Sequence, residues 1–572
     1  MTNAIKKRWT TSPKISADAN QKLKDFPAVF RQILFNRGIS DEESAQAFLN
    51  ADQPVYSPES LLDIDRAVNL IAETILLHKR IVIFGDYDVD GVTSTVVLVQ
   101  LLQKAGADVV MYIPNRFEEG YGFSMDALNE VLQLNPDLII TVDCGVRSIR
   151  EVHAAEERDV RVIITDHHQP LEELPPADAV ICPRRSGDPY PNKNLAGVGI
   201  AYKLAQRYLE KYPLAGEEAG QWLDLVALGT VADLAPLSGE NRVMVRQGLQ
   251  VMRTGPRPGI LSLANVSRVP IQEVNAQHIG FMLGPRLNAA GRLSSARKAY
   301  DLLMATETRE AGELALDLDE ENQSRRLITR QIQGSVEEKY DFSSDQWLIL
   351  CADESYNEGV IGLAASKLAE SYYRPSVIGV EKEEVVRASC RSIPELNITS
   401  ALDECMDLLV QHGGHAMAAG LTVRKENLPA LKERLSAIIA RELCDIQLSP
   451  VLEAEMEVNL SDLHPSLFKF LNDLEPTGVE NPSPLFIARD VEIRKMWAVG
   501  KTQEHLKLTL ADPRYHQDRQ LHSPVIVDAI AFQFGALANE LSIGDHIDIV
   551  FAYEINTYNG NQTIQLNVRD IQ

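Results

Sequence analysis

Short apolar runs alternate with amphipathic helical patterns between residues 81 and 182. The apolar runs are continuous, which is typical of strands that are buried on both faces of a parallel sheet. The alternation therefore predicts an α/β fold with a doubly wound parallel sheet. Ligands of such sheets bind at the carboxyl ends of the strands.

Acidic and imidazole side chains follow three of these predicted strands. The strand at 81–84 leads into Asp86, Asp88 and Asp90, the strand at 138–142 into Asp143, and the strand at 161–165 into Asp166, His167 and His168. We expect these groups to converge at one edge of the sheet.

The remaining patterns predict further domains. A charged helical stretch without proline indicates a solvated connecting helix, a second α/β pattern follows it, and several short β patterns at the end indicate a small barrel or sandwich. The predicted parts are a helical N-terminal lead-in at 1–75, the first α/β domain at 76–300, the connecting helix at 301–344, the second α/β domain at 345–448, and the β-barrel at 449–572.

Composition narrows the class of protein. The 572 residues are 45% hydrophobic and 24% charged, and no apolar stretch is long enough to span a bilayer. The N-terminus lacks the apolar core of a signal peptide, so we expect a cytoplasmic protein that does not contact membranes. The six cysteines show neither a CxxC pair nor zinc spacing. A formal charge of −25 means that any nucleic-acid binding must use local basic surfaces.

The carboxylates of Asp86, Asp88 and Asp90 lie within one turn and repel one another unless a cation neutralises them. An EF-hand loop is excluded because position 12, counted from Asp88, is Val99. Capping of the next helix by these side chains is an alternative interpretation. Asp143, His167, His168 and Asp233 favour the metal, because carboxylate and imidazole ligands without thiolates suit Mn²⁺ or Mg²⁺. Such a set can hold two ions for phosphoester or phosphoanhydride hydrolysis.

Four motifs in order, GDYDVDG, TVDCG, TDHH and GTVAD, resemble those of the DHH phosphoesterase superfamily, and GGHAMAAG resembles the DHHA1 domain. Further segments, among them LFNRGIS, LGPRLNAAGRL and EPTGVENPSPLF, are similar to the RecJ family of bacterial single-stranded-DNA-specific exonucleases. The resemblance runs from about Phe26 to the C-terminus.

The resemblance implies metal ligation by five residues: Asp88, Asp90, Asp143, His167 and Asp233. Asp143 is the expected bridge between two Mn²⁺ or Mg²⁺ ions. Asp86, Asp166 and His168 are expected to act in catalysis, either by binding directly or by orienting a ligand or the substrate.

Substrate contacts are implied for seven residues: Arg116, Arg286, Asn288, Arg292, Ser389, Arg391 and His415. For Arg116 the alternative is a surface salt bridge, and for His415 it is local packing under a glycine turn. Asn357 stands where the family usually has His, and Ala388 replaces the first glycine of the family's GSxRS stretch.

The C-terminal β region resembles an OB-fold, which binds single strands through a basic groove and stacking aromatics. The expected nucleic-acid track comprises Arg494, Lys495, Trp497, Lys501 and Lys507. A core position is the alternative for Trp497.

The resemblance implies a 5′-to-3′ exonuclease that releases 5′-mononucleotides from single-stranded DNA in recombination and repair. It also implies a helicase and a single-strand-binding protein as partners, and we expect a monomer. Two alternatives remain open. One is a relative that acts on short oligonucleotides, cyclic dinucleotides or pyrophosphate, and the other is a catalytically inactive replication scaffold.

Overall fold

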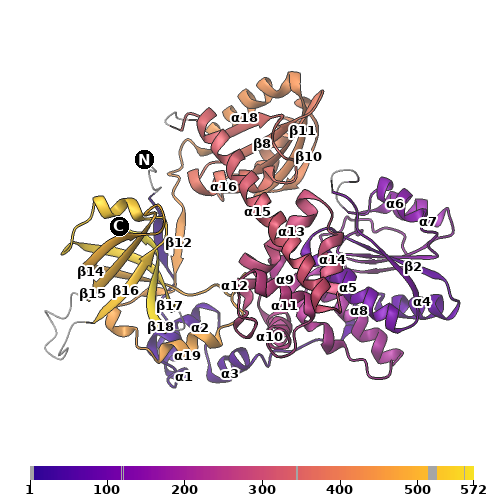
Figure 1. The fold of residues 1–572 in the computed structure, drawn as a ribbon, viewed down its shortest axis with the longest axis horizontal. Coiled ribbons are helices and arrows are strands. Elements are labelled where there is room, and N and C mark those ends of the chain that lie inside the picture. The colour runs from indigo at the N-terminus through magenta and orange to yellow at the C-terminus, as the bar shows by residue number, and fades with distance from the viewer. Residues whose placement is uncertain (1–5, 117–118, 120–121, 343–345, 513–524, 559–560) are drawn as a thin grey trace. The chain divides into compact units, whose positions relative to one another are not determined.

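A computed structural model describes residues 6–116, 119, 122–342, 346–512, 525–558 and 561–572 (Figure 1). The chain forms two compact units. One is Pro54–Leu448, and the other combines Met1–Gln53 with Ser449–Gln572. Within the described residues, no helix has the length and apolar character needed to cross a bilayer.

The unit Pro54–Leu448 begins with the predicted parallel sheet. Its strand order is β3-β2-β4-β5-β6, and every pairing is parallel. The strands are β2 (Arg80–Gly85), β3 (Asp108–Tyr112), β4 (Leu138–Val142), β5 (Arg161–Thr165) and β6 (Ala179–Ile181). The flanking helices are α4 (Ile64–Leu76), α5 (Val89–Lys104), α6 (Met125–Leu132), α7 (Ile149–Glu156) and α8 (Gly197–Lys211).

Each face of this sheet has its own hydrophobic core. Ile81 and Ile83 of β2 pack with α4, α5 and α8, whereas Val82 and Phe84 pack with α6 and α7. Because successive side chains of a strand point to opposite faces, one apolar run serves both cores. The doubly wound sheet is therefore confirmed.

Helices complete this first lobe and lead to the second. They are α9 (Leu223–Ala232), α10 (Gly239–Thr254), α11 (Pro258–Val266), α12 (Ala276–His278), the π-helical turn η4 (Ile279–Leu283), α13 (Gly284–Leu293) and α14 (Arg297–Met304). The connecting helix α15 (Thr308–Lys339) then contacts α13 and α14 at one end and α16 at the other (Figure 1).

The second lobe is a mixed sheet of order β10-β11-β9-β8-β7, in which only β7 and β8 pair in parallel. Its strands are β7 (Ile349–Asp353), β8 (Ser376–Glu381), β9 (Val385–Arg391), β10 (Leu409–His415) and β11 (Ala418–Arg424), with helices α16 (Ile361–Tyr372), α17 (Ile398–Asp403) and α18 (Leu428–Leu443). The predicted glycine-rich turn at 413–420 is mostly strand, because β10 and β11 continue into a tight hairpin.

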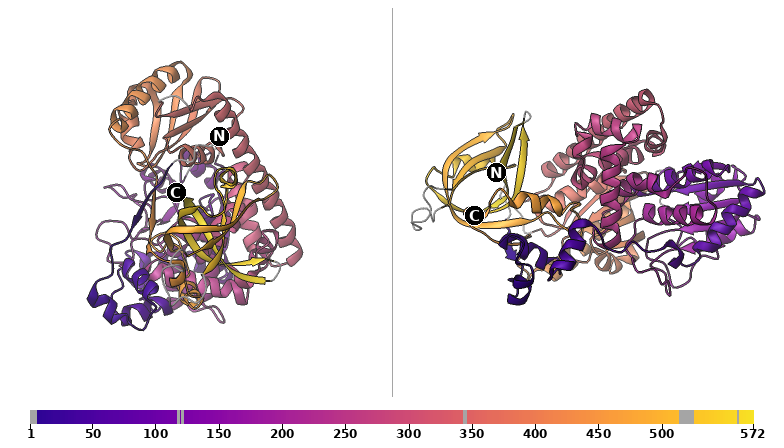
Figure 2. Two further views of the ribbon diagram at one scale, coloured as in Figure 1. Left: turned by 90° about the vertical axis from the view of Figure 1, so that its left-hand side faces the viewer. Right: turned by 90° about the horizontal axis from the view of Figure 1, so that it is seen from below.

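The other unit contains a closed five-stranded barrel of order β14-β15-β16-β18-β17, closed by pairing of β14 with β17 (Figure 2). Its strands are β14 (Leu485–Val499), β15 (His505–Ala511), β16 (Ile526–Ala531), β17 (His546–Tyr558) and β18 (Asn561–Ile571). The predicted fold class, two α/β lobes joined by a long helix and a C-terminal OB-like barrel, is confirmed.

The described residues 6–53 pack with this barrel, so the region predicted as one lead-in at 1–75 is divided between the two units. Phe30 and Ile33 share a core with Phe486 and Phe551 of the barrel. The N-terminal elements are β1 (Arg8–Thr11), α1 (Ala17–Lys22), α2 (Ala28–Asn36) and α3 (Glu42–Asn50), and they meet β12 (Val451–Ala454), β13 (Met456–Glu457) and α19 (Leu467–Asp473). Contacts so distant in sequence leave no local pattern.

Candidate active site

The first acidic cluster lies where β2 ends and α5 begins. The Oδ1 of Asp88 accepts hydrogen bonds from the backbone N–H groups of Asp90 (2.9 Å) and Gly91 (3.1 Å), so Asp88 caps the helix. A Cβ at Gly91 would lie 2.6 Å from the carbonyl oxygen of Asp86, so only glycine fits there. The capping interpretation is thus correct for one oxygen of Asp88, and the other two carboxylates need a separate explanation.

Asp90 is held in place by the start of α8. Its carboxylate accepts hydrogen bonds from the backbone N–H groups of Gly197 (2.6 Å) and Val198 (2.8 Å). The adjacent Asp143 follows β4 in the left-handed region, with φ 61°. A Cβ at Gly197 would lie 2.7 Å from the Cβ of Asp143, so this glycine permits the close approach.

The imidazole of His167 lies close to three carboxylates of the cluster. Its Nε2 lies 3.1 Å from Oδ1 of Asp143, 3.8 Å from Oδ2 of Asp233 and 3.9 Å from Oδ2 of Asp90. The three strand ends contribute to one cluster, as the sequence predicted from their positions, and Asp233 joins it from the end of α9. Ligand atoms gather within 4.8 Å in three overlapping groups, namely Asp90-His167-Asp233, Asp86-Asp88-Asp143 and Asp143-His167-His168.

Several buried atoms of this cluster have no hydrogen-bond partner among the described residues: both carboxylate oxygens of Asp86, Oδ1 of Asp143, and Nε2 of His167. Unsatisfied buried polar atoms are rare and costly in native proteins. These are all good ligand atoms for a hard divalent cation, so the residues fit two overlapping cation sites that share Asp143.

The pKa values agree with this interpretation. Burial, followed by the neighbouring carboxylates, raises the pKa of Asp143 well above its usual range. The same causes raise the pKa of Asp90 to about 7 and that of Asp233 to about 9. Burial, then the adjacent His168, lowers the pKa of His167 to about 4, so its imidazole is neutral. A neutral imidazole is the form that binds metals.

Asp166 and His168 form a separate pair beside the cluster. Oδ1 of Asp166 lies 2.7 Å from Nδ1 of His168, and Oδ2 accepts a hydrogen bond from the backbone N–H of Val146 (2.9 Å). Burial opposes the charge on both groups, but their contact outweighs it, so the pKa of Asp166 is lowered and that of His168 is raised. The pair is suited to hold a protonated imidazole next to a phosphate.

Residues of α13 adjoin the acidic loop in different ways. Oδ1 of Asn288 accepts a hydrogen bond from the backbone N–H of Val89 (3.1 Å), so Asn288 positions the start of α5. Arg286 is paired with Asp319 of α15 (2.8 Å), which neutralises one of the predicted phosphate-binding cations. Arg292 has no described ion pair and donates only a long hydrogen bond to the carbonyl of Gly359 (3.4 Å).

Arg116 and the second lobe face the same recess. The guanidinium of Arg116 lies 5.0 Å from the centroid of the Tyr87 ring and forms no ion pair with a carboxylate of the described residues. In the second lobe, a Cβ at Gly362 would lie 3.1 Å from Nη2 of Arg391 and 3.4 Å from Oγ of Ser389. Nε of Arg391 donates to Oγ of Ser366 (3.1 Å).

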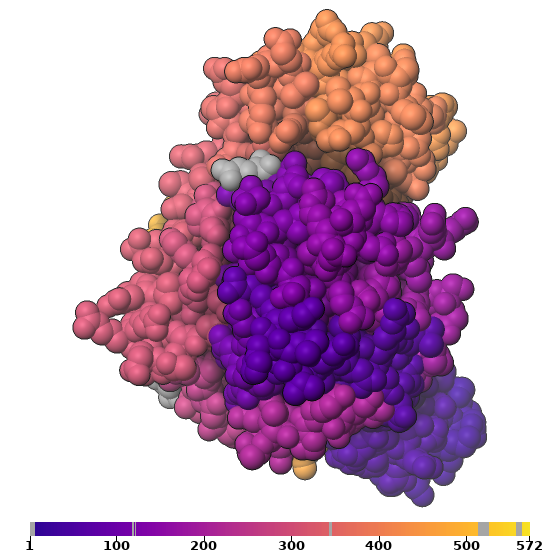
Figure 3. All heavy atoms as spheres, turned by 90° about the vertical axis from the view of Figure 1, so that its right-hand side faces the viewer, coloured from indigo at the N-terminus to yellow at the C-terminus, as the bar shows by residue number. Residues whose placement is uncertain are grey.

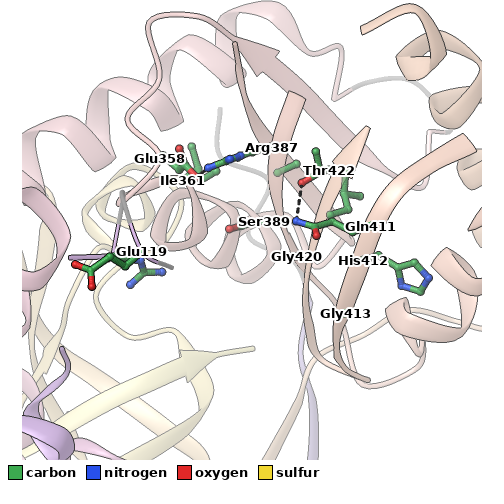
Figure 4. A pocket seen from close by; sticks show the side chains of 13 residues that line it. Glu119, Glu358, Ile361, Arg387, Ser389, Gln411, His412, Gly413, Gly420 and Thr422 are labelled. Atoms are coloured by element: carbon green, nitrogen blue, oxygen red, sulfur yellow. Dashed lines mark hydrogen bonds and ion pairs between the residues drawn. The ribbon is translucent and has the colours of Figure 1, made fainter. Parts of the chain in front are cut away.

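A cavity of about 640 Å³ opens between the two lobes of this unit, and the space-filling view shows a recess there (Figure 3). Three successive residues of β9, Arg387, Ala388 and Ser389, line it, and β10 and β11 supply Gln411, Gly413, Gly420 and Thr422. Figure 4 shows Arg387 reaching toward Glu358, at 3.2 Å. Sequence reasoning missed Glu358, Arg387 and Gln411, although the alternation of Val385–Arg391 places Arg387 on the face of Ser389.

Two expectations for the second lobe need comment. His415 is exposed at the end of β10 and is not among the residues that line the cavity, so local packing does not explain it. His412, which the sequence did not single out, lines the cavity instead, with its ring turned away from the other lining side chains (Figure 4). Asn357, in the position of the family His, accepts a hydrogen bond from the backbone N–H of Gly359 (2.9 Å).

The predicted track on the barrel lies on its outer face. Trp497 is 42% exposed, which excludes the core interpretation, and Lys507 on the paired strand lies 5.7 Å from its ring centroid. Lys495 and Lys501 are exposed, whereas Arg494 is paired with Glu492 (2.9 Å). Phe532, 50% exposed and missed from the sequence, follows β16 on the same face and contacts His505.

Comparison with known proteins agrees with the three parts. Residues 80–230 match the DHH family, N-terminal domain; residues 344–441 match the DHHA1 domain; and residues 454–570 match the RecJ OB domain. The closed barrel and the two sheets are thus the matching regions.

Curated relatives cover most of the chain. The single-stranded-DNA-specific exonuclease RecJ of Bacillus subtilis is 37% identical over 94% of this chain and 67% of the relative. The protein of the same name from Haemophilus influenzae is 34% identical over 91% of this chain and 92% of the relative. A crystal structure of RecJ in complex with Mn²⁺ from Thermus thermophilus superposes with a TM-score of 0.84 at 28% identity, covering 100% of this chain and 80% of that one. Taken with the acidic cluster and the three-part fold, these similarities show that the chain belongs to the RecJ family.

Proposed function

We propose that this chain is a divalent-metal-dependent exonuclease that degrades single-stranded DNA from the 5′ end to 5′-mononucleotides, in recombination and repair. The observation that carries the proposal is the buried cluster of Asp86, Asp143 and His167 with unsatisfied ligand atoms, which Asp233 adjoins. The names of the curated relatives support the substrate, and the Mn²⁺ and Mg²⁺ complexes of the Thermus protein support the cofactor.

The residues that would hold two Mn²⁺ or Mg²⁺ ions are Asp88, Asp90, Asp143, His167 and Asp233, with Asp143 between the two groups. Such ions activate water and stabilise charge on the phosphate oxygens. Asp86 has two unsatisfied oxygens and completes the ligand set or orients it. Backbone N–H groups at the start of α8 fix Asp90, so its carboxylate needs no reorganisation on binding.

The protein's own groups then serve the phosphate. His168, kept protonated by Asp166, donates to a phosphate oxygen or to the leaving oxygen. Ser389 and Arg391 receive the 5′-terminal phosphate, and Arg116 and Arg292 bind the phosphates on the other side of the scissile bond. Ser389 lies beside the cavity, so a terminal nucleotide has room between the lobes.

Partners and location follow from the same chemistry. An enzyme that accepts only single strands needs duplex DNA to be opened, so we propose that a helicase supplies the substrate and that a single-strand-binding protein covers it. We also propose that the chain acts as a monomer in the cytoplasm.

The test is digestion of single-stranded and duplex DNA, labelled at the 5′ or the 3′ end, with Mn²⁺, Mg²⁺ or a chelator. A 5′-to-3′ exonuclease releases labelled mononucleotide at once from 5′-labelled single strands and leaves the duplex intact. Activity confined to dinucleotides or cyclic dinucleotides would instead support the short-substrate alternative. Binding without hydrolysis in either metal would support the scaffold alternative.

A further inference from the structure

The face of α15 that packs against the two lobes is apolar at both ends and polar in the middle. Ala315 and Leu318 are buried in the core of the first lobe, and Ile332 belongs to a core of the second lobe. Between them the same face, at helical spacings of four and three, carries Asn322 and Arg325. The two polar side chains therefore lie where α15 passes from the core of the first lobe to that of the second.

Neither polar residue has a partner within the described part of the chain. Asn322 is only 3% exposed, yet its Oδ1 accepts no hydrogen bond. Nε of Arg325 is buried and donates none. Each such group costs free energy in the folded protein. Two of them one turn apart indicate a ligand that satisfies both.

The neighbouring charges point to an anion. Arg286 on α13 is neutralised by Asp319, whereas Arg292 on the same helix forms no ion pair with any residue that the structure describes. Burial, then Arg116, then Arg325 lowers the pKa of Arg292 to about 10. The guanidiniums of Arg116 and Arg325 repel that of Arg292, and a phosphate backbone would relieve the repulsion.

These cations lie next to the acidic cluster. A Cβ at Gly291, beside Arg292, would be 2.7 Å from the carbonyl oxygen of Tyr87. Asn288 on the same helix is bonded to the backbone of Val89. The helix α13 therefore joins the acidic loop to α15, the helix that carries Asn322 and Arg325.

We infer that Arg325 and Asn322 are substrate-binding residues of the connecting helix: Arg325 donates to a backbone phosphate beside Arg292, and Oδ1 of Asn322 accepts a hydrogen bond from an N–H or O–H group of the same nucleotide. The inference rests on the proposed function and extends it to α15, which sequence reasoning treated only as a solvated spacer. A planar guanidinium matches two phosphate oxygens at once.

The test is Arg325→Met, measured by anisotropy with a long 5′-phosphorylated single strand in chelator, together with thermal unfolding. We expect binding weaker by roughly tenfold or more. The slope of log affinity against log salt concentration should also decrease in magnitude by about one. The Tm should stay the same or rise, because an unpartnered buried charge has been removed. A structural role for Arg325 predicts the reverse, a lower Tm with an unchanged salt dependence.

Matched variants complete the experiment. Arg330→Met removes an exposed charge from the same helix and should leave affinity close to wild type. Arg325→Lys should restore the salt dependence, and Asn322→Leu should raise the Tm while weakening binding. Wild-type affinity in Arg325→Met, or equal losses in Arg325→Met and Arg330→Met, would overturn the inference. Failure of the wild-type protein to degrade single strands would instead overturn the proposed function.

Discussion

Nε2 of His167 lies 3.1 Å from Oδ1 of Asp143, and neither atom has a hydrogen-bond partner among the described residues. An imidazole nitrogen that faces a carboxylate oxygen in a buried site is poised for a shared cation. Asp143 belongs to two of the three ligand groups and contacts His167, which belongs to the third, so its removal should affect every ion.

Asp143→Ala should therefore lose both bound ions and all nuclease activity while the fold survives. In metal-free protein the substitution removes a buried, repelled carboxylate, so the Tm without metal should not fall. Metal content by elemental analysis and the Tm with chelator measure the two effects. Glu156→Ala, an exposed acid on α7, is the control, and two ions retained in Asp143→Ala would refute the bridging role.

Metal stabilisation should grow with pH. In the metal-free protein burial and neighbouring carboxylates raise the pKa of Asp90 to about 7 and that of Asp233 to about 9, whereas in the unfolded chain both titrate near 4. Between about pH 4 and 9 the folded state thus holds more protons, so its free energy of unfolding falls as pH rises. Bound metal takes the place of those protons.

The measurement is the Tm of Mg²⁺-loaded protein minus that of chelator-treated protein, from pH 6 to pH 9. We expect the difference to increase with pH, and Asp233→Asn should flatten the increase. A difference that shrinks with pH would show that these carboxylates are already ionised without metal.

Arg391→Ala should weaken binding of 5′-phosphorylated strands more than binding of 5′-hydroxyl strands. A charge-assisted hydrogen bond is worth roughly 1.5 to 3 kcal/mol, so the ratio of the two affinities should fall by about tenfold or more. Arg424→Ala, an exposed arginine at the end of the neighbouring β11, controls for charge. Equal losses for both kinds of strand would place Arg391 outside the terminal-phosphate site.

Trp497→Ala should weaken binding of long single strands by about 1 to 3 kcal/mol, because bases stack on exposed aromatic rings. Hydrolysis of very short oligonucleotides, which need not reach the barrel, should be unchanged. Phe532→Ala should show a smaller loss of the same kind. Ile543→Ala, which removes an apolar side chain at another exposed position, should bind normally, and normal binding by Trp497→Ala would exclude the track.

Truncation at Ser449 alone should destabilise the N-terminus. It removes the core against which Phe30 and Ile33 pack, and it removes Glu455, the buried partner of Arg37 at 2.8 Å. Limited proteolysis should then digest residues 1–53 rapidly. Removal of both 1–53 and 449–572 should leave a stable fragment, and equal protease resistance of the two truncations would contradict this pairing.

Local pattern was enough for much of this protein. The continuous apolar run 81–84 followed by Asp86, Asp88 and Asp90 identifies a buried strand and its acidic turn, because strand and turn are contiguous in sequence. Parallel strands share one edge, so Asp143 and His167 could be assigned to the same cluster before any distance was known. Part of the outer face of the barrel could also be predicted, since Trp497 has lysine and arginine residues close to it in sequence.

Only the tertiary structure decided what depends on distant neighbours. Arg286 and Arg292 look alike in sequence, but Asp319 of α15 pairs with the first, whereas the second is buried without an ion pair among the described residues. The pairing of residues 1–53 with the barrel, and the unsatisfied Asn322 and Arg325 on a helix that reads as solvated, arise from contacts across the chain. Whether a side chain is buried, and whether it has a hydrogen-bond or ion-pair partner, depends on the packed molecule. A charge pattern along one helix therefore cannot reveal either property.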